Sequence, residues 1–312
     1  MVNYLDFENE IIALDKTINE LDNKNPKNIE KIKKLQNEKE DLLLNIYSNL
    51  NAWQKVQVSR HNSRPHTIDF INNIFEDIVF LHGDKKYADD HAIIGGLAKI
   101  DNRSVMIIGT EKGNSMETRI KHNFGMAKPE GYRKAQRLMQ LAEKFKLPTI
   151  IFVDTAGAFP GKDAEERGQS ESIASSINIS LNIKTPMISI VIGEGGSGGA
   201  IALATTDKVL MLENAIYSVI SPEGCASILW RDKNFSQIAA ENLKLTARDC
   251  LKYKIIDEII EEVIGGAHRD HKNQSAIVKK SILKNLEDLD QFSLNDLVLN
   301  RKNKFLNITS NI

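Results

Sequence analysis

The sequence predicts an α/β protein in which mostly parallel strands alternate with helices, flanked by helical segments at both ends. Short apolar runs rich in β-branched residues occur at 149–153, 187–192 and 208–212, and each is typical of a buried strand. The segments between them are helical in length or in periodicity. Strands separated by helices favour parallel pairing, with functional loops at the carboxyl ends of the strands.

The two ends of the chain carry helical periodicity. Residues 1 to about 50 predict an antiparallel hairpin of amphipathic helices, interrupted by polar residues and a proline at 23–28. Scaffolding or partner contact is favoured there over chemistry. We therefore expect an N-terminal extension over 1–66 and a main domain over 67–312, whose tail is helical again from about residue 273.

Several elements follow in order between these ends. A helix is predicted to start at the N-cap Thr67 and to bury an apolar face that includes Ile78. Residues 93–100 and 105–109 predict a β-hairpin with a polar turn. A helix beginning at Pro129 is expected to bury a face that ends at Phe145, another helix is expected near 163–181, and a short strand is expected at 215–220.

Composition excludes several classes of protein. Lysine and arginine total 41 against 42 acidic residues, so the net charge does not favour binding to nucleic acid or to a membrane surface. The start of the chain lacks the pattern of a signal peptide, which predicts a soluble, cytoplasmic protein. Cys225 and Cys250 are the only cysteines; we expect both to be reduced and Cys225 to be buried, with no disulfide framework and no metal site in this chain.

The segment Gly193 to Ala200 contains the strongest functional signal. It reads Gly-Glu-Gly-Gly-Ser-Gly-Gly-Ala and lies between the apolar run at 187–192 and a helix-like continuation, which predicts a strand, a glycine turn and a helix. Small residues leave the backbone amides accessible to a ligand, and amides at a helix N-terminus attract negative charge. The segment therefore predicts an anion or oxyanion site.

Three motifs compete for this segment. A phosphate-binding P-loop is excluded because no lysine follows Gly198. A dinucleotide fingerprint matches at Gly193, Gly195 and Gly198, with Glu213 about twenty residues further on, but the following helix is too short for the usual crossover. An oxyanion hole formed by the amides of Gly198, Gly199 and Ala200 fits the density of glycines best, and glycines that serve only close packing are the structural alternative.

A second loop at 154–161 also follows a buried strand and carries Gly157, Pro160 and Gly161, so we expect the two loops to face one pocket. We expect Asp154 to bond nearby amides rather than to take part in catalysis. Ser197 is disfavoured as a nucleophile because the sequence places no histidine beside it. We expect His268 to brace a loop rather than to contact a ligand.

These motifs carry a specific resemblance. The chain resembles the carboxyltransferase alpha subunit of bacterial-type acetyl-CoA carboxylase over nearly its whole length. The segments that carry the resemblance include 153–161 (VDTAGAFPG), 164–171 (AEERGQSE), 193–200 (GEGGSGGA), 217–230 (YSVISPEGCASILW), 123–126 (NFGM), 129–135 (PEGYRKA) and 265–269 (GGAHR).

The resemblance implies a crotonase (ClpP-like) fold, which is a spiral of ββα units. It also implies that the amides of Gly198, Gly199 and Ala200 hold the ureido oxygen of biotin. The substrate-binding positions that it implies are Gly157, Ala158, Gly195, Gly196 and Ser197.

The implied reaction transfers a carboxyl group from carboxybiotin, carried on a biotin carrier protein, to acetyl-CoA and forms malonyl-CoA for fatty acid biosynthesis. The implied partners are a beta subunit with a zinc ribbon, in an α2β2 heterotetramer, and a biotin carboxylase that uses ATP. The basic stretch from Lys112 to Arg137 is expected either to attract coenzyme A phosphates or an acidic carrier domain, or to be a solvated helix face.

The sequence departs from the family pattern at two places. Ala156 replaces the usual proline of the turn, and the sequence of residues 110–118 differs from the commoner family sequence around its Lys-Gly pair. Two alternative functions remain at this point. A hydratase or isomerase of the same fold needs a carboxylate base, for which Glu165 and Glu166 are the candidates, and the helical ends suggest a noncatalytic scaffold subunit.

Overall fold

The protein is described here by a computed structural model that covers residues 3–21 and 25–308. The strands are β1 (Glu76–Phe80), β2 (Ile93–Ile100), β3 (Arg103–Thr110), β4 (Thr149–Thr155), β5 (Met187–Gly196), β6 (Lys208–Leu212), β7 (Ile216–Ser218) and β8 (Glu258–Ile260). The α-helices are α1 (Asn9–Glu20), α2 (Pro26–Ser48), α3 (Ala52–Ser59), α4 (Thr67–Ile74), α5 (Met116–Lys121), α6 (Pro129–Phe145), α7 (Lys162–Glu166), α8 (Gln169–Asn182), α9 (Ser197–Ala204), α10 (Pro222–Leu229), α11 (Ser236–Leu243), α12 (Ala247–Lys252), α13 (His271–Leu289) and α14 (Leu294–Leu306).

These strands form one mixed sheet with the order β1-β2-β3-β4-β5-β6-β8, and β7 pairs with the end of β5. Pairing is antiparallel from β1 to β3 and parallel from β3 to β8. The predicted hairpin is confirmed, and its turn residues Asp101 and Asn102 have φ values of 42° and 23°. Asp and Asn tolerate this left-handed region better than most residues. The α/β class with parallel pairing is therefore confirmed.

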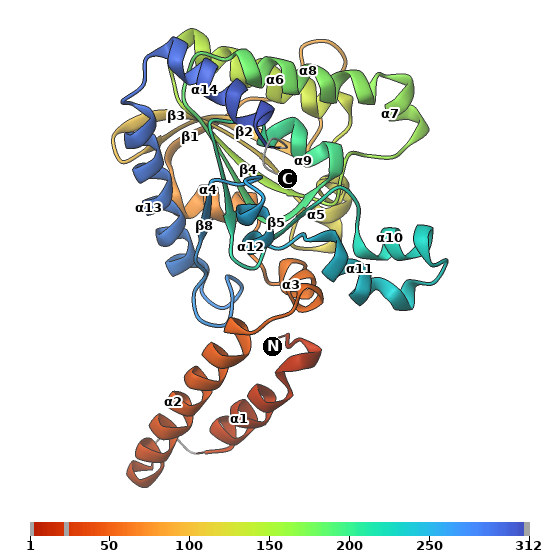
Figure 1. Cartoon of the computed structure of the whole chain (residues 1–312). Helices are drawn as coiled ribbons and strands as arrows, with labels where there is room; N and C mark the ends of the chain where they lie inside the picture. The colour runs from red at the N-terminus through yellow and green to blue at the C-terminus, as the bar shows by residue number, and fades with distance from the viewer. Residues whose placement is uncertain (1–2, 22–24, 309–312) are drawn as a thin grey trace.

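Strands β4 and β5 form the centre of the core. Every residue of β4 is buried, and so is every residue of β5 before Gly196, which explains why both read as nearly continuous apolar runs. Helices α6, α8 and α9 pack together on one face of the sheet, and α4 and α13 pack on the other (Figure 1). The prediction that Phe145 is buried is wrong, because this residue of the last turn of α6 is 58% exposed.

The start of the sheet differs from the sequence prediction. Helix α4 ends at Ile74, and Ile78 lies in β1 rather than on a helix. The N-cap is His66, whose amide donates to Asp69, whereas the Thr67 hydroxyl donates to the Thr110 carbonyl at 2.5 Å. Strand β1 escaped prediction because it is a half-exposed edge strand that opens with two acidic residues.

The helix expected near 163–181 consists of two helices. Helices α7 and α8 are separated at Gly168, which has a φ of +83°. A glycine adopts this left-handed conformation without the steric cost that a Cβ adds. The break lets the chain turn from the second glycine-containing loop into α8.

The N-terminal helices form a unit that projects from the sheet (Figure 1). Helices α1 and α2 share a small core with the last turn of α3, through Ile11, Leu43, Tyr47 and Val58. The helical hairpin is confirmed in the described residues, and positions 23 and 24 of its predicted break lie outside them. Helix α3 also packs on the main body, through Ala52 and Val56. The domain boundary after residue 66 remains a prediction.

The C-terminal half contains elements that were not predicted from the sequence. Helices α10, α11 and α12 and strand β8 lie between β7 and the tail, and α10 and α11 form a lateral projection in Figure 1. The predicted helical tail is confirmed by α13 and α14. Within the described part of the chain, no helix is both long and apolar enough to cross a membrane.

Candidate active site

The glycine-rich segment begins as a strand rather than as a turn. Strand β5 continues through Gly196, and α9 starts directly at Ser197. Gly195 pairs with Thr155 of β4 and with Tyr217 of β7. The predicted glycine turn is therefore wrong in its first half, because pairing with strands on both sides extends the ladder through these glycines.

The two predicted loops meet in backbone contact. A Cβ on Gly196 would lie 2.2 Å from the carbonyl oxygen of Ala156. A Cβ on Gly199 would lie 2.7 Å from the carbonyl carbon of Gly157 and 2.8 Å from the amide nitrogen of Ala158. Real Cβ atoms do not approach backbone this closely. Glycine is required at these two positions, and the expectation that the loops converge is confirmed.

Amides converge at this contact. Ser197, Gly198 and Gly199 form the first turn of α9, whose amides precede the helical hydrogen-bond ladder and carry the positive end of the helix dipole. Ala200 is fully buried one residue deeper, where a regular helix directs its amide to the carbonyl of Gly196. A ligand for the amides of Gly198, Gly199 and Ala200 remains a prediction.

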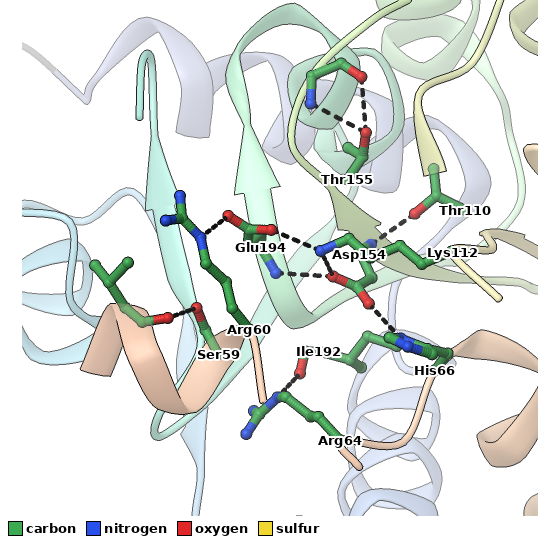
Figure 2. A network of polar contacts seen from close by, with 12 residues as sticks. Ser59, Arg60, Arg64, His66, Thr110, Lys112, Asp154, Thr155, Ile192 and Glu194 are labelled. Atoms are coloured by element: carbon green, nitrogen blue, oxygen red, sulfur yellow. Dashed lines mark hydrogen bonds and ion pairs between the residues drawn. The ribbon is translucent and has the colours of Figure 1, made fainter. Parts of the chain in front are cut away.

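The turn that carries Ala156 is anchored in spite of the missing proline. The hydroxyl of Thr155 accepts from the amide of Gly157 at 3.1 Å and donates to the carbonyl of the same residue at 2.8 Å (Figure 2). Gly157 has a φ of +148°, which strongly favours glycine. Ala158 is half-buried and Ser197 is exposed with a φ of 50°.

Asp154 lies at the centre of a buried charge network beside the glycine strand. Its Oδ1 accepts from the Glu194 amide at 3.0 Å and pairs with the Lys112 ammonium at 2.8 Å. Its Oδ2 lies 2.8 Å from Nδ1 of His66 (Figure 2). The prediction that Asp154 bonds nearby amides is confirmed.

Glu194 extends this network across the sheet end. Lys112 lies 2.7 Å from its Oε2, and Arg60 lies 2.6 Å from its Oε1. Arg60 also pairs with Glu223 of α10 at 2.5 Å. Helices α3 and α10 are thereby tied to the strand that leads into α9.

The network keeps its carboxyl groups ionised. Burial raises the pKa of Asp154, but Lys112 and the hydrogen bond from His66 outweigh burial and hold this pKa well below its usual range. Burial likewise raises the pKa of Glu194, and Lys112 and Arg60 bring it below its ordinary value. Burial lowers the pKa of Lys112, but Asp154 and Glu194 raise it overall. Each charge is stabilised by an opposite neighbour.

A cavity of about 210 Å³ opens beside this network. Arg60, His66, Lys112, Phe124 and Glu194 contribute to its lining. Arg60 and His66 were not identified as site residues from the sequence. Glu194 could have indicated that basic partners lie nearby, because a charged residue inside a buried strand requires a buried counter-charge.

The basic stretch from Lys112 to Arg137 was expected either to attract phosphates or a carrier domain, or to be a solvated helix face. Three of its cations do neither. Lys112 is held by Asp154 and Glu194, Lys134 by Asp89, and Arg133 by Asp84 at 2.8 Å. These side chains are at most 15% exposed. They neutralise acidic residues inside the fold, so they are neither a solvated face nor free phosphate ligands.

Two further expectations concern the periphery. His268 is half-buried with both ring nitrogens inside the fold, and its ring stacks on His61 with the centroids 4.0 Å apart. Burial lowers the pKa of His268 to about 2, with His61 and Arg269 adding to the effect, which supports a bracing role as a neutral ring. The prediction that Cys225 is buried is wrong, because it is partly exposed near the start of α10; Cys250 is buried. The described residues contain no group of His, Cys, Asp and Glu that could hold a metal ion.

The fold and the paired loops define a class. The chain superposes on a transcarboxylase 12S chain with a TM-score of 0.59 at 18% identity, over 76% of this chain and 45% of that one. It also superposes on the beta subunit of geranyl-CoA carboxylase from P. aeruginosa with a TM-score of 0.57 at 17% identity, over 78% and 46% of the two chains. The protein has the crotonase-like carboxyltransferase fold, as predicted.

The sequence comparisons name the family. The model of the family described as "Acetyl co-enzyme A carboxylase carboxyltransferase-like" matches residues 4–309. The acetyl-coenzyme A carboxylase carboxyl transferase subunit alpha of Pelagibacter ubique is 53% identical over 99% of this chain and 85% of its own length. That of Rhodospirillum centenum is 52% identical over 98% of both chains. The chain belongs to this carboxyl-transferring family, which confirms the resemblance found in the sequence.

Proposed function

We propose that this chain is the alpha subunit of an acetyl-CoA carboxylase carboxyltransferase and that it supplies the biotin side of carboxyl transfer to acetyl-CoA, forming malonyl-CoA for fatty acid biosynthesis. The observation that carries the proposal is the contact between the loop at Gly157 and Ala158 and the first turn of α9 at Gly199. This contact concentrates backbone amides where no side chain fits.

The chemistry follows from those amides. Carboxybiotin, when bound, supplies the carboxyl group that is transferred. The amides of Gly198 and Gly199 hold an oxygen that gains negative charge, and the N-terminus of α9 adds its dipole. The third donor in this proposal is the amide of Ala158 rather than that of Ala200, because α9 directs the Ala200 amide to the Gly196 carbonyl. Glycine at 196 and 199 lets the backbone of the 154–161 loop approach the first turn of α9 closely, which a Cβ at either position would prevent. Because α9 is anchored in the core through Ala200 and Ala202, the donors are oriented before the ligand arrives.

The charge network supports this geometry without touching a reacting atom. Asp154 accepts the amide of Glu194, and Glu194 is bound from both sides by Lys112 and Arg60. These bonds hold the last residues of β4 and β5 in register, immediately before the chain enters the two loops. In this assignment the network acts on the position of the amides.

We further propose that the site is completed by a beta subunit carrying a zinc ribbon, in an α2β2 assembly, and that a biotin carrier protein and an ATP-dependent biotin carboxylase supply the carboxyl group in the cytoplasm. Support comes from the relatives, which are named as alpha subunits. The chain also has only two cysteines, too few for a ribbon with cysteine ligands.

The same-fold alternative has no support in the geometry. A hydratase or isomerase needs a carboxylate poised at the pocket, but Glu165 and Glu166 are exposed on α7, and Glu166 pairs with Lys162 at 3.3 Å. The family match favours the carboxyltransferase.

The experiment that tests the proposal is reconstitution. The chain is purified alone and together with a family beta subunit, and malonyl-CoA formation from carboxybiotin and acetyl-CoA is measured. Activity is expected only in the mixture. Formation of malonyl-CoA by the single chain would contradict the shared site, and an inactive but stably assembled complex would contradict the proposed reaction.

A further inference from the structure

Tyr132 buries a hydroxyl that has no partner in the described residues. The side chain belongs to α6 and is fully buried, and its Oη makes no hydrogen bond within the described part of the chain. A buried hydroxyl without a hydrogen-bond partner destabilises a protein relative to one that has a partner. A phenylalanine would fill the same space without this cost, so stability of the isolated chain does not explain the hydroxyl.

The position of the hydroxyl is informative. The point that a Cβ on Gly199 would occupy lies 3.0 Å from Tyr132 Oη, and the same point lies within 2.8 Å of the backbone of Gly157 and Ala158. The hydroxyl therefore lies at the junction between the two amide-bearing loops.

Burial, with a contribution from Asp90, raises the pKa of the Tyr132 hydroxyl above its ordinary value. The group therefore remains a neutral hydrogen-bond donor throughout the range in which proteins of this kind are folded. Such a donor is suited to bond an oxygen that binds at the junction.

We propose that Tyr132 is a positioning residue for carboxyl transfer: its hydroxyl sets the spacing between the Ala158 amide and the first turn of α9, and gains its hydrogen-bond partner at this junction when the site is occupied. The inference rests on the proposed function and adds to it a residue from a helix that neither loop contains. Tyr132 holds the donors in place, and the donors contact the ligand.

The test compares Tyr132→Phe with Thr149→Val in the complex with the beta subunit. Thr149 also has a fully buried hydroxyl without a partner in the described residues, but it starts β4, at the opposite end of the strand from the loops. Each substitution preserves the shape of the side chain and removes one hydroxyl without a partner, so the two variants differ mainly in where the hydroxyl lies. Measurements are kcat, KM for acetyl-CoA, the thermal midpoint, and amide hydrogen exchange at 157–159 and 197–199.

For Tyr132→Phe we expect kcat to fall about tenfold and KM to stay within twofold. Misplaced donors stabilise the transition state less, whereas the binding of acetyl-CoA in the ground state is little affected. Its thermal midpoint should be unchanged or higher, and exchange should accelerate at the two loops. Thr149→Val should leave kcat and loop exchange unchanged. Wild-type kcat in Tyr132→Phe, or a loss of activity that parallels a fall in thermal midpoint, would overturn the inference. An inactive wild-type complex would refute the proposed reaction instead, and loop exchange would still test Tyr132.

Discussion

Gly199 shows how a single hydrogen atom in place of a side chain determines the site. Its missing Cβ leaves room for the backbone of Gly157 and Ala158, whereas a Cβ on neighbouring Gly198 would meet only Ile173, at an ordinary 3.5 Å. The two glycines are adjacent in sequence but differ in what they permit. Gly199 allows contact between the loops, whereas Gly198 leaves the first turn of α9 without a side chain at its position.

A matched pair of substitutions tests this difference. Gly199→Ala should separate the loops and lower kcat for malonyl-CoA formation about 100-fold, the cost typical of one lost oxyanion donor. Gly198→Ala retains the amide and meets no backbone, so its kcat should fall by less than about tenfold. Steady-state kinetics of the two assembled complexes make the comparison, and equal losses would contradict the steric argument.

Asp154 is the residue on which the buried charges depend. Asparagine at this position keeps the shape but leaves Lys112 and His66 facing a neutral group, and breaking a buried pair typically costs about 3–5 kcal/mol. We expect Asp154→Asn to lower the free energy of unfolding by this amount in urea titrations. Asp77→Asn is the control, because its pair with Lys99 is exposed, and it should leave the urea midpoint unchanged. Comparable stability of the two variants would show that the network is not energetically coupled.

Among the elements, the C-terminal helix α14 is tied to the fold through the buried side chain of Arg301. Arg301 is almost fully buried, pairs with both carboxylate oxygens of Asp207 at 2.8 and 2.7 Å, and donates to the carbonyls of Ser180, Ile183 and Thr185. The bonds connect α14 to the end of α8 and to the turn before β6. A planar guanidinium satisfies this set of acceptors, whereas an ammonium does not.

Arg301→Lys should therefore destabilise the fold although it preserves charge. We expect a loss of about 3 kcal/mol in the free energy of unfolding, from acceptors left without donors in a buried site. Lys302→Arg is the control on the same helix, since Lys302 is partly exposed and donates to the side chain of Asn182. If both variants unfold at the wild-type urea concentration, α14 is held by its apolar contacts instead.

At the scale of the whole molecule, a buried ion pair couples folding to pH. Arg64, between α3 and α4, pairs with Glu262 after β8, with both side chains 1% exposed. Burial raises the pKa of Glu262, but Arg64 and the Ala267 amide lower it from its ordinary 4.5 to about 2. A carboxyl group with a lowered folded pKa stabilises the protein above its unfolded pKa and loses this contribution as the pH falls towards the folded value.

Wild-type stability should therefore decline as the pH falls from about 4.5 towards about 2. Glu262→Gln should be less stable at pH 7 and should show a flatter decline across this interval, measured as urea midpoints against pH. Glu166→Gln, which alters an exposed pair, should reproduce the wild-type profile. A Glu262→Gln curve parallel to the wild type would assign the acid sensitivity to other carboxyl groups.

Local pattern was sufficient to predict much of this molecule. The apolar runs of β4, β5 and β6, the β2–β3 hairpin and the start of α6 at Pro129 follow from periodicity and turn chemistry. The loops at 154–161 and 193–200 were identified because glycines follow buried strands. Edge strand β1 and the glycine half of β5 were missed, because their conformation depends on pairing with distant strands.

The sequence by itself determined the fold class, the family and the two glycine loops, because these depend on spacing and residue type along the chain. Only the tertiary structure decided that Gly199 contacts Gly157 and Ala158, that Glu194 is neutralised by Arg60 and Lys112, and that Tyr132 lies beneath the junction. These contacts join residues that are far apart in the chain. Their partners are chosen by the register of parallel strands and the packing of helices on the sheet, which no local pattern encodes.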